Sequence, residues 1–134
     1  MTDSANVDLV RSIYADWERG DFGDVESAHP EIELVFADGP TPGSWTGIES
    51  ATVAWRDFLR TWVEYRVEAG EYLELDNGRV LVLDHERGSG KLSGLDIGDI
   101  KAKGASLFRI RYGKVTRLVI YWDRDRALAD LGLE

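Results

Sequence analysis

Cysteine is absent from this 134-residue chain, and histidine, basic side chains and long apolar runs are scarce. Without cysteine the protein forms neither disulfide bonds nor thiolate metal sites, and a reducing compartment is compatible with the sequence. No apolar run approaches the ~18 residues that a membrane span needs. The opening segment MTDSANVDLV also lacks the basic and apolar parts of a signal peptide. We therefore expect a soluble, cytoplasmic protein.

The charge balance is acidic. Asp and Glu number 25 against 16 Lys and Arg, which gives a net charge of −9. Such a surface repels phosphate backbones and anionic lipid, so we expect neither a nucleic-acid partner nor a membrane partner. The two histidines, His29 and His85, lie far apart and lack metal-ligand spacing, and no glycine loop has the spacing that cradles phosphate. We therefore expect no metal and no cofactor.

Hydrophobic residues make up 43% of the chain, with five Trp, five Tyr and four Phe, which is enough for a packed interior. No linker or internal repeat interrupts the sequence, so residues 1–134 are expected to form a single domain.

Residues 7–17 carry an apolar face at helical spacing. Asp21 can cap a second, short helix that ends near His29-Pro30, because the residue before proline avoids helical geometry. Thr46 and Glu49 resemble a capping box. The third helix would begin there, with the apolar face Ile48, Trp55, Phe58 or Leu59, and Trp62.

Elsewhere the apolar period is two, which is typical of strands. From Tyr65 onward, Val67, Ala69, Leu73 and Leu75 are expected on one face and Tyr72 on the other. The run Val80–Leu83 is apolar throughout, so that strand should be buried on both faces. Residues 37–45 and the glycine-rich segment 88–98 are expected to be connections. The remaining elements are strands at 31–36, 101–112 and 115–122, a turn at 76–78, and a final helix at 123–131 that ends before Gly132.

This order predicts an α+β fold. Three N-terminal helices would pack against a curved, mixed, mostly antiparallel sheet, and a short helix would end the chain. The result is a cone-shaped α+β barrel with a pocket between helices and sheet.

Several segments resemble the SnoaL-like branch of the nuclear transport factor 2-like superfamily. IYADWERGDF is similar to its first helix, SWTGIESATVAW to its third helix, and Ser93-Gly94 with YGKVTRLVIYWDRDRALADLGL to its C-terminal part. This group is similar in fold to ketosteroid isomerase and to polyketide cyclases. The resemblance implies the fold and leaves the activity open, since this fold supports many chemistries.

The likeness to ketosteroid isomerase places Asp38 where that enzyme keeps its general base. Flanking Phe36 and Trp45 could desolvate the carboxylate and raise its proton affinity. The alternative is that Asp38 serves an ordinary Asp-Gly turn. In the isomerase a tyrosine and a protonated aspartic acid assist the base. Here Tyr14 lies one residue from the matching position, a rotation of ~100° on a helix, and is expected in the core. Ser106 stands near the place of the acid, so steroid isomerisation is not expected.

Asp84 and His85 form a second candidate pair at the end of the apolar run. Alternation means that one of the two side chains faces the pocket. The resemblance puts Asp84 inward with Val80 and Val82, whereas a slip of one residue would put His85 there. Either could act as an acid or a base. The alternative is that both are solvated near a strand end or lie in a dimer contact.

The pocket walls follow from the same alternation and from the resemblance. An aromatic-lined pocket suits a flat apolar ligand such as a polyketide, a terpenoid or an aromatic compound. The alternative is that most of these side chains simply fill the core. The expected lining residues are Trp17, Phe36, Trp55, Leu59, Trp62, Ser106, Phe108, Ile110, Leu118, Ile120 and Trp122.

Two functions are compatible with these patterns. The first is a cofactor-free acid–base enzyme of the lyase, isomerase or cyclase type, with Asp38 as base and Asp84, His85 or Tyr14 as proton partner. The second is a non-catalytic module for small-ligand binding or dimerisation. Related folds often pair through the outer sheet face, which implies a homodimer. The contributing residues would be Tyr72, Leu81 or Leu83, and Tyr121.

Overall fold

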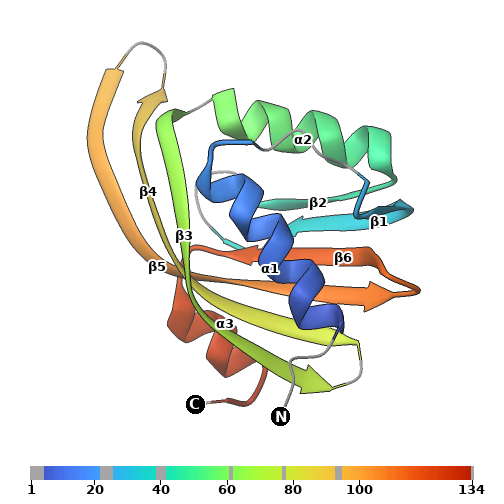
Figure 1. Cartoon of the computed structure of the whole chain (residues 1–134). Helices are drawn as coiled ribbons and strands as arrows, with labels where there is room; N and C mark the ends of the chain where they lie inside the picture. The colour runs from blue at the N-terminus through green and yellow to red at the C-terminus, as the bar shows by residue number, and fades with distance from the viewer. Residues whose placement is uncertain are drawn as a thin grey trace.

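The computed structural model describes residues 5–21, 26–38, 42–60, 62–76, 78–92 and 95–133, with the backbone alone for 62–64, 89–92 and 95–102. Within these residues the chain forms three helices and six strands (Figure 1). In chain order they are α1 (Ala5–Glu18), β1 (Ala28–Phe36), β2 (Gly43–Thr46), α2 (Ile48–Arg60), β3 (Trp62–Asp76), β4 (Arg79–Leu92), β5 (Leu95–Arg111), β6 (Lys114–Tyr121) and α3 (Arg124–Asp130). None of the described helices is long and apolar enough to cross a membrane.

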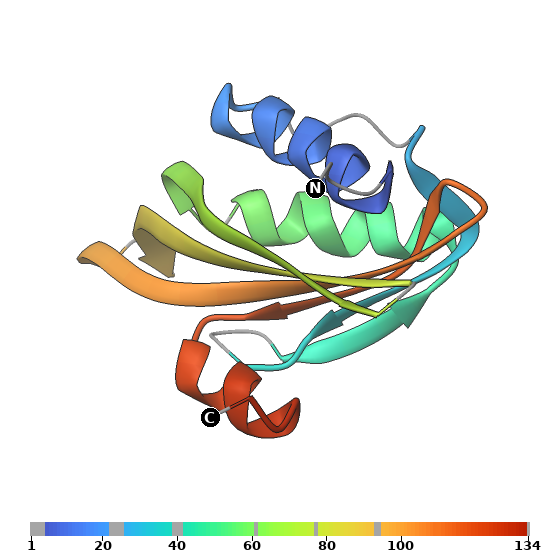
Figure 2. The ribbon, with the colours of Figure 1, turned by 60° about the horizontal axis from the view of Figure 1, so that its bottom comes forward.

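The six strands form one sheet in the order β2-β1-β6-β5-β4-β3. β1 pairs with β6 in parallel, and every other neighbouring pair is antiparallel. The sheet curves strongly, with α1 and α2 on one side and α3 on the other (Figure 2). This arrangement confirms the predicted α+β class, the mixed, mostly antiparallel sheet and the short final helix. The sheet stays open, because β2 and β3 are edge strands.

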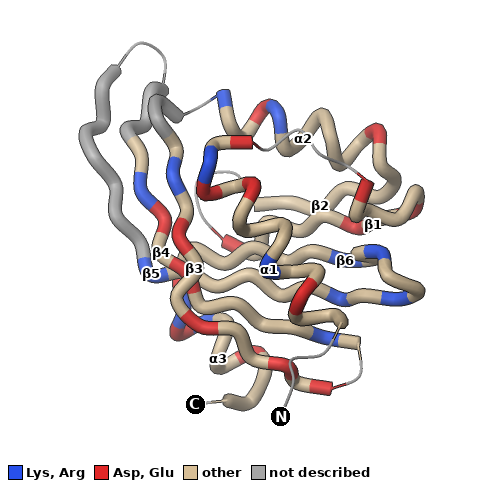
Figure 3. The backbone as a smooth tube through the Cα atoms, viewed as in Figure 1, with Lys and Arg blue, Asp and Glu red and all other residues tan. Residues whose placement is uncertain are grey.

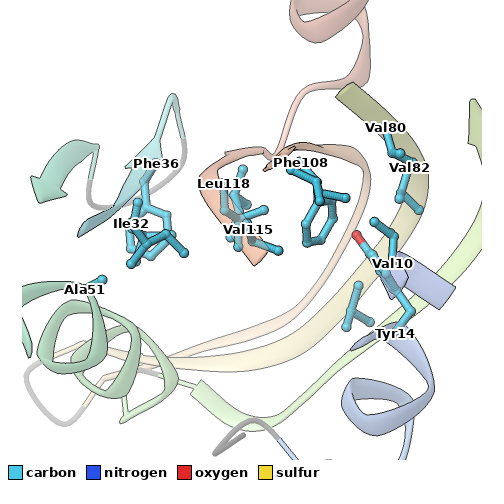
Figure 4. Close-up of a cluster of buried hydrophobic side chains, with 14 of the residues drawn as sticks. Val10, Tyr14, Ile32, Phe36, Ala51, Val80, Val82, Phe108, Val115 and Leu118 are labelled. Carbon is cyan, nitrogen blue, oxygen red and sulfur yellow. The ribbon is translucent and has the colours of Figure 1, made fainter. Parts of the chain in front are cut away.

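Two hydrophobic clusters hold these layers together. The larger lies between the sheet and the helices α1 and α2, where Tyr14, Val82, Phe108 and Leu118 are buried (Figure 4). The smaller lies on the other face beneath α3 and contains Leu81. Val80, Leu81 and Val82 are all fully buried, which confirms that this part of β4 is covered on both faces. Side chains of β4 therefore alternate between the two clusters.

A bulge in β3 changes the face that its side chains occupy. The pairing with β4 shifts register between Ala69 and Glu71, so one extra residue enters β3. Val67 and Ala69 pack in the larger cluster, but Leu73 and Leu75 pack in the smaller one. The prediction that these four share a face is therefore wrong. Tyr72 packs inside against Tyr14, with ring centroids 6.1 Å apart, and not on the outer face.

Four other expectations need correction. Ala28–Phe36 is a strand, so His29 and Pro30 do not end a helix; residues 22–25 of that expected helix lie outside the described ones. Gly43–Thr46 forms β2 within the expected loop. Trp62 begins β3 and does not continue α2. The segment 88–98 belongs largely to β4 and β5, because pairs such as Gly88 with Ile100 satisfy its backbone. Glycine content suggested a connection, but strand pairing prevails.

The terminal hairpin and helix are confirmed. β5 and β6 are joined by Tyr112 and Gly113, both at positive φ (53° and 72°), which suits a tight hairpin turn. Asp123 caps α3, because its side chain accepts the N–H groups of Asp125 and Arg126. Gly132 follows the helix with a φ of 68°, where a residue with a side chain would be strained.

Candidate functional site

Two acidic side chains on β4 enter the interior of the protein. Asp84 is 0% exposed and Glu86 is 2% exposed. They lie two residues apart, so the alternation that buries Val80 and Val82 on the helix-covered side brings both carboxyls to that side. His85 lies between them and is exposed. The sequence left open whether Asp84 or His85 points inward, and the structure shows that it is Asp84.

Tyrosine hydroxyls hold one oxygen of each carboxyl. Tyr14 on α1 donates to Asp84 Oδ2 at 2.6 Å, and Ser106 on β5 donates to the same oxygen at 3.3 Å. Tyr65 on β3 donates to Glu86 Oε1 at 3.1 Å. Tyr14 therefore lies in the core, as expected, but its hydroxyl also belongs to the acidic site. Three elements distant in sequence meet at this pair.

The other two carboxyl oxygens face a common space. Asp84 Oδ1 and Glu86 Oε2 are buried and have no hydrogen-bond partner among the described residues. A Cβ placed on Gly104 would lie 3.0 Å from Asp84 Oδ1 and 3.1 Å from Glu86 Oε2. The same Cβ would lie 2.5 Å from the carbonyl oxygen of Tyr121, so any residue larger than glycine would force the backbone to move here.

Burial raises the pKa of both carboxyls, and the neighbouring groups then act differently on each. Burial raises the pKa of Asp84 to about 6, opposed by hydrogen bonds from Tyr14 and Ser106 and by the charge of Arg124. Burial, and then the charge of Asp84, raise the pKa of Glu86 well above its usual range. Of the two carboxyls, Asp84 therefore has three neighbours that favour its ionised form, whereas the charge of Asp84 favours the protonated form of Glu86. Burial also raises the pKa of Tyr14, which stays a hydrogen-bond donor.

Arg124 anchors the strands beneath the carboxyl pair. Its guanidinium donates to the backbone carbonyl of Asp84 at 2.9 Å and to that of Gly104 at 3.2 Å. The start of α3 is thus tied to both strands that form the site.

Asp38 occupies a structural position next to this site. Its Oδ1 accepts the N–H of Trp122 at 2.5 Å and its Oδ2 accepts that of Asp123 at 3.2 Å. The carboxylate thereby joins the end of β1 to the start of the α3 cap. Its charge also contributes to raising the pKa of Glu86. The role of Asp38 as a base stays a prediction, and its geometry is that of a backbone clamp.

Aromatic rings link the two tyrosines that hold the carboxyls. Successive rings lie with centroids 4.9 to 6.4 Å apart, the range in which aromatic pairs attract. The series runs from Tyr14 through Trp17, Trp55, Phe58 and Tyr65 to Trp122.

A cavity of about 370 Å³ lies between α1, α2 and the strands β1 and β6. Its walls are mainly apolar, and Arg56 is the charged residue among the described lining. Trp17 and Phe108 line the cavity and also contact the ring of Tyr14, whose hydroxyl donates to Asp84. Five of the predicted lining residues lie on its walls: Trp17, Trp55, Leu59, Phe108 and Leu118.

The other predicted lining residues lie elsewhere. Phe36 is buried against Trp45 and Phe58, beside a separate hollow of about 530 Å³. Ile110 and Ile120 fill the core, and Trp122 packs partly buried against Phe58 and Tyr65. The Trp62 side chain lies outside the described residues. Among the described residues, no group of three or more His, Cys, Asp or Glu could hold a metal ion.

Sequence reasoning missed Glu86 and Tyr65. The inward direction of Glu86 could have been predicted from the period of two, because Glu86 continues the series Val80, Val82 and Asp84. Tyr65 shares the period of two with Val67 and Ala69, so its inward direction was predictable as well, but its partnership with Glu86 depends on how β3 pairs with β4.

No protein-family model matches the chain, and no curated protein matches its sequence. Solved structures do match. An NTF2-like protein of unknown function from Burkholderia pseudomallei is 19% identical, with a TM-score of 0.76 over 95% of this chain and 97% of that one. TerC, co-crystallised with polyporic acid, is 22% identical, with a TM-score of 0.73 over 96% and 98%. A candidate SnoaL-like polyketide cyclase from Jannaschia sp. CCS1 is 16% identical, with a TM-score of 0.74 over 90% of each chain.

The chain therefore has the α+β cone fold of NTF2-like proteins, as the sequence resemblance implied. Its neighbours in fold include SnoaL-like and ketosteroid isomerase-like proteins. At these identities the comparison shows the fold and no activity.

Proposed function

We propose that this protein is a cytoplasmic, cofactor-free acid–base enzyme of the lyase, isomerase or cyclase type, acting on an apolar or aromatic small molecule. The observation that carries the proposal is the buried pair Asp84 and Glu86. Each carboxyl is held by a tyrosine on one oxygen, and the other oxygen faces the space beside Gly104. Titratable pairs whose environments separate their protonation states are typical of acid–base sites.

The two carboxyls suit complementary roles. Asp84, ionised at neutral pH, accepts a proton from the substrate. Glu86, whose protonated form is favoured by burial and by the charge of Asp84, donates a hydrogen bond to the oxygen on which negative charge develops. Tyr14 and Ser106 position Asp84, and Tyr65 positions Glu86. A carbonyl compound with an acidic neighbouring C–H fits both roles, because loss of its proton places charge on the carbonyl oxygen.

The apolar surroundings support an apolar substrate. The cavity of about 370 Å³ is lined by Trp17 and Phe108, and its volume is within the size range of small-molecule sites. A substrate that enters from this cavity reaches Asp84 by displacing these two rings. TerC, a neighbour in fold, was co-crystallised with polyporic acid, which supports a small organic ligand.

Proton exchange tests the proposal without knowledge of the natural substrate. The apolar ketone 2-tetralone is incubated with the protein in D₂O, and deuterium entry next to the carbonyl is followed by NMR. The wild type should accelerate exchange, and Asp84→Asn and Glu86→Gln should each reduce that acceleration by ~100-fold or more, the usual size of an acid–base contribution. The control is Asp57→Asn, since the Asp57 side chain on α2 is 66% exposed. Exchange equal to wild type in both site variants would refute the assignment.

The cavity itself favours a second candidate function, non-catalytic binding of an apolar ligand. Its described lining contains no carboxyl group. Quenching of tryptophan fluorescence by an aromatic ligand measures binding, because Trp17 and Trp55 line the walls. Binding that survives in Asp84→Asn, with no proton exchange in the wild type, would favour the binding function over the enzyme.

We also propose a homodimer through the outer sheet face. Leu81 and Tyr121 are 0% and 6% exposed beneath α3, so they are covered within one chain. Leu83, which is half-buried, is the one predicted contact that remains available on that face. Light scattering at micromolar concentration tests the proposal, and a monomeric mass would refute it.

A further inference from the structure

Three arginines lie side by side across the outer face of the sheet, on the opposite face from the carboxyl pair. In the strand pairing, Arg79 on β4 stands opposite Arg109 on β5, and Arg109 stands opposite Arg117 on β6. Figure 3 shows basic segments on these three neighbouring strands. We call these three residues the arginine row. Like charges directly opposite each other destabilise strand pairing, so the row is costly unless an anion compensates it.

Acidic side chains compensate the row at its two ends. Arg79 Nε lies 2.8 Å from Asp76 Oδ2. The Nε atom of Arg117 lies 3.1 Å from Glu33 Oε1. This nitrogen atom is buried and makes no aligned hydrogen bond there. Arg109, in the centre, is exposed and has no ion pair with any described residue. The middle of the row therefore carries uncompensated positive charge in a protein whose net charge is −9.

The row borders a hollow of about 600 Å³ between the sheet and α3. Arg126 of α3 supplies a fourth guanidinium to its wall, and Leu107 and Val119 are among its apolar lining residues. One carboxylate also lines it: Asp130 accepts a hydrogen bond from the Tyr121 hydroxyl at 3.2 Å and lies 3.9 Å from Arg126. The hollow thus combines four arginine side chains with a partly apolar surface.

We propose that this hollow is a binding site for a small multivalent anion that carries phosphate or carboxylate groups. The planar guanidinium group binds both kinds of oxyanion through paired N–H donors. Arg109 is the central ligand, and Arg79, Arg117 and Arg126 surround the anion. The site is independent of the proposed acid–base chemistry, because it lies on the opposite face of the sheet.

Calorimetric titration with sodium pyrophosphate and with sodium citrate, at fixed ionic strength, tests the site. The wild type should bind at least one of them with a dissociation constant in the millimolar range or below. Arg109→Gln should weaken binding at least tenfold, since hydrogen bonds to charged groups contribute on that scale. A preference for pyrophosphate would indicate a phosphate ligand and a preference for citrate a carboxylate ligand, and both results support the site.

Two further variants make the test specific. Arg87→Gln is the matched control, because Arg87, like Arg109, is an exposed arginine on a strand of the sheet. It lies on β4, 3.9 Å from Glu68, and does not line the hollow. It should change affinity by less than twofold. Glu33→Gln should tighten binding several-fold, because it releases Arg117 to the anion. Absence of millimolar binding of both anions to the wild type, or equal losses in Arg109→Gln and Arg87→Gln, would overturn the proposal.

Discussion

Replacement of Asp84 by asparagine should make the free energy of unfolding less dependent on pH. Asp84 is fully buried, and burial raises its pKa from an ordinary 3.8 to about 6. The folded carboxyl therefore holds its proton more tightly than the unfolded one. Between these two pKa values the folded state binds more protons, so Asp84 makes the protein less stable as pH rises through that window. Asparagine keeps the shape of the side chain and removes this titration.

The expected effect is large relative to the stability of a small domain. The difference between the ordinary pKa of 3.8 and the folded-state pKa of about 6 corresponds to ~3 kcal/mol in the free energy of unfolding. Of this, ~2 kcal/mol falls between pH 4.5 and 7.5, compared with ~5–15 kcal/mol for whole domains. Glu86 acts in the same direction, because burial raises its pKa as well. Asp76 acts in the opposite direction, since a hydrogen bond from the Gly78 N–H lowers its pKa. Comparison of the variant with the wild type cancels the Asp76 contribution; the variant also removes the Asp84 charge that raises the pKa of Glu86, which adds to the effect in the same direction.

Urea denaturation at pH 4.5 and at pH 7.5 provides the measurement. From pH 4.5 to pH 7.5, the free energy of unfolding of Asp84→Asn should rise by ~2 kcal/mol relative to that of the wild type. This corresponds to about 1 M in urea midpoint for an m-value of ~2 kcal/mol/M. The exposed Asp57→Asn should show no such gain. If Asp84→Asn and the wild type had the same pH dependence, Asp84 would not be the buried titrating group.

Three further substitutions test the surroundings of the carboxyl pair. Gly104→Ala should destabilise the fold by ~1–3 kcal/mol by overpacking, because its Cβ would crowd a backbone carbonyl and both carboxyls; the urea midpoint measures the loss. Tyr14→Phe should cost ~1–3 kcal/mol and raise the pKa of Asp84 further, because the buried carboxylate loses a donor. A carbon-13 NMR titration that shows an unchanged Asp84 pKa would contradict this expectation. Asp38→Ala should cost ~1–3 kcal/mol in thermal unfolding, because the Trp122 N–H loses its acceptor. Lost proton exchange at full stability would instead favour Asp38 as the base.

Local sequence signals were sufficient to predict the terminal hairpin and helix, and the inward direction of the Asp84 side chain. The Tyr112-Gly113 turn and the Asp123 cap follow from residue types whose preferred backbone geometry is short-range. Asp84 points inward because the alternation from Val80 is unbroken. Glu86 obeys the same alternation, so its burial could also have been predicted.

Other features depend on contacts between distant segments. The bulge at Gly70 turns Tyr72 inward. A glycine within a strand often marks a bulge, but it does not fix how the two strands pair on either side of it. Tyr14 and Asp84 meet across 70 residues of sequence. Periodicity indicates which face a side chain occupies, but the partner on that face is set by the curvature of the whole sheet. Asp38 is a further example, because its role depends on the backbone N–H of Trp122.

The parallel pairing of β1 with β6 has a consequence for how the protein folds. Leu34 stands beside Leu118 in this pairing, so the sheet joins segments from opposite ends of the fold. Closing so long a loop costs chain entropy before the contact contributes any stability. During synthesis, β1 and β2 can form their hairpin early, yet β1 keeps an unpaired edge until β6 has left the ribosome. The docking of β6 is therefore expected to be a late step in folding, and it also brings Trp122 to the carboxylate of Asp38.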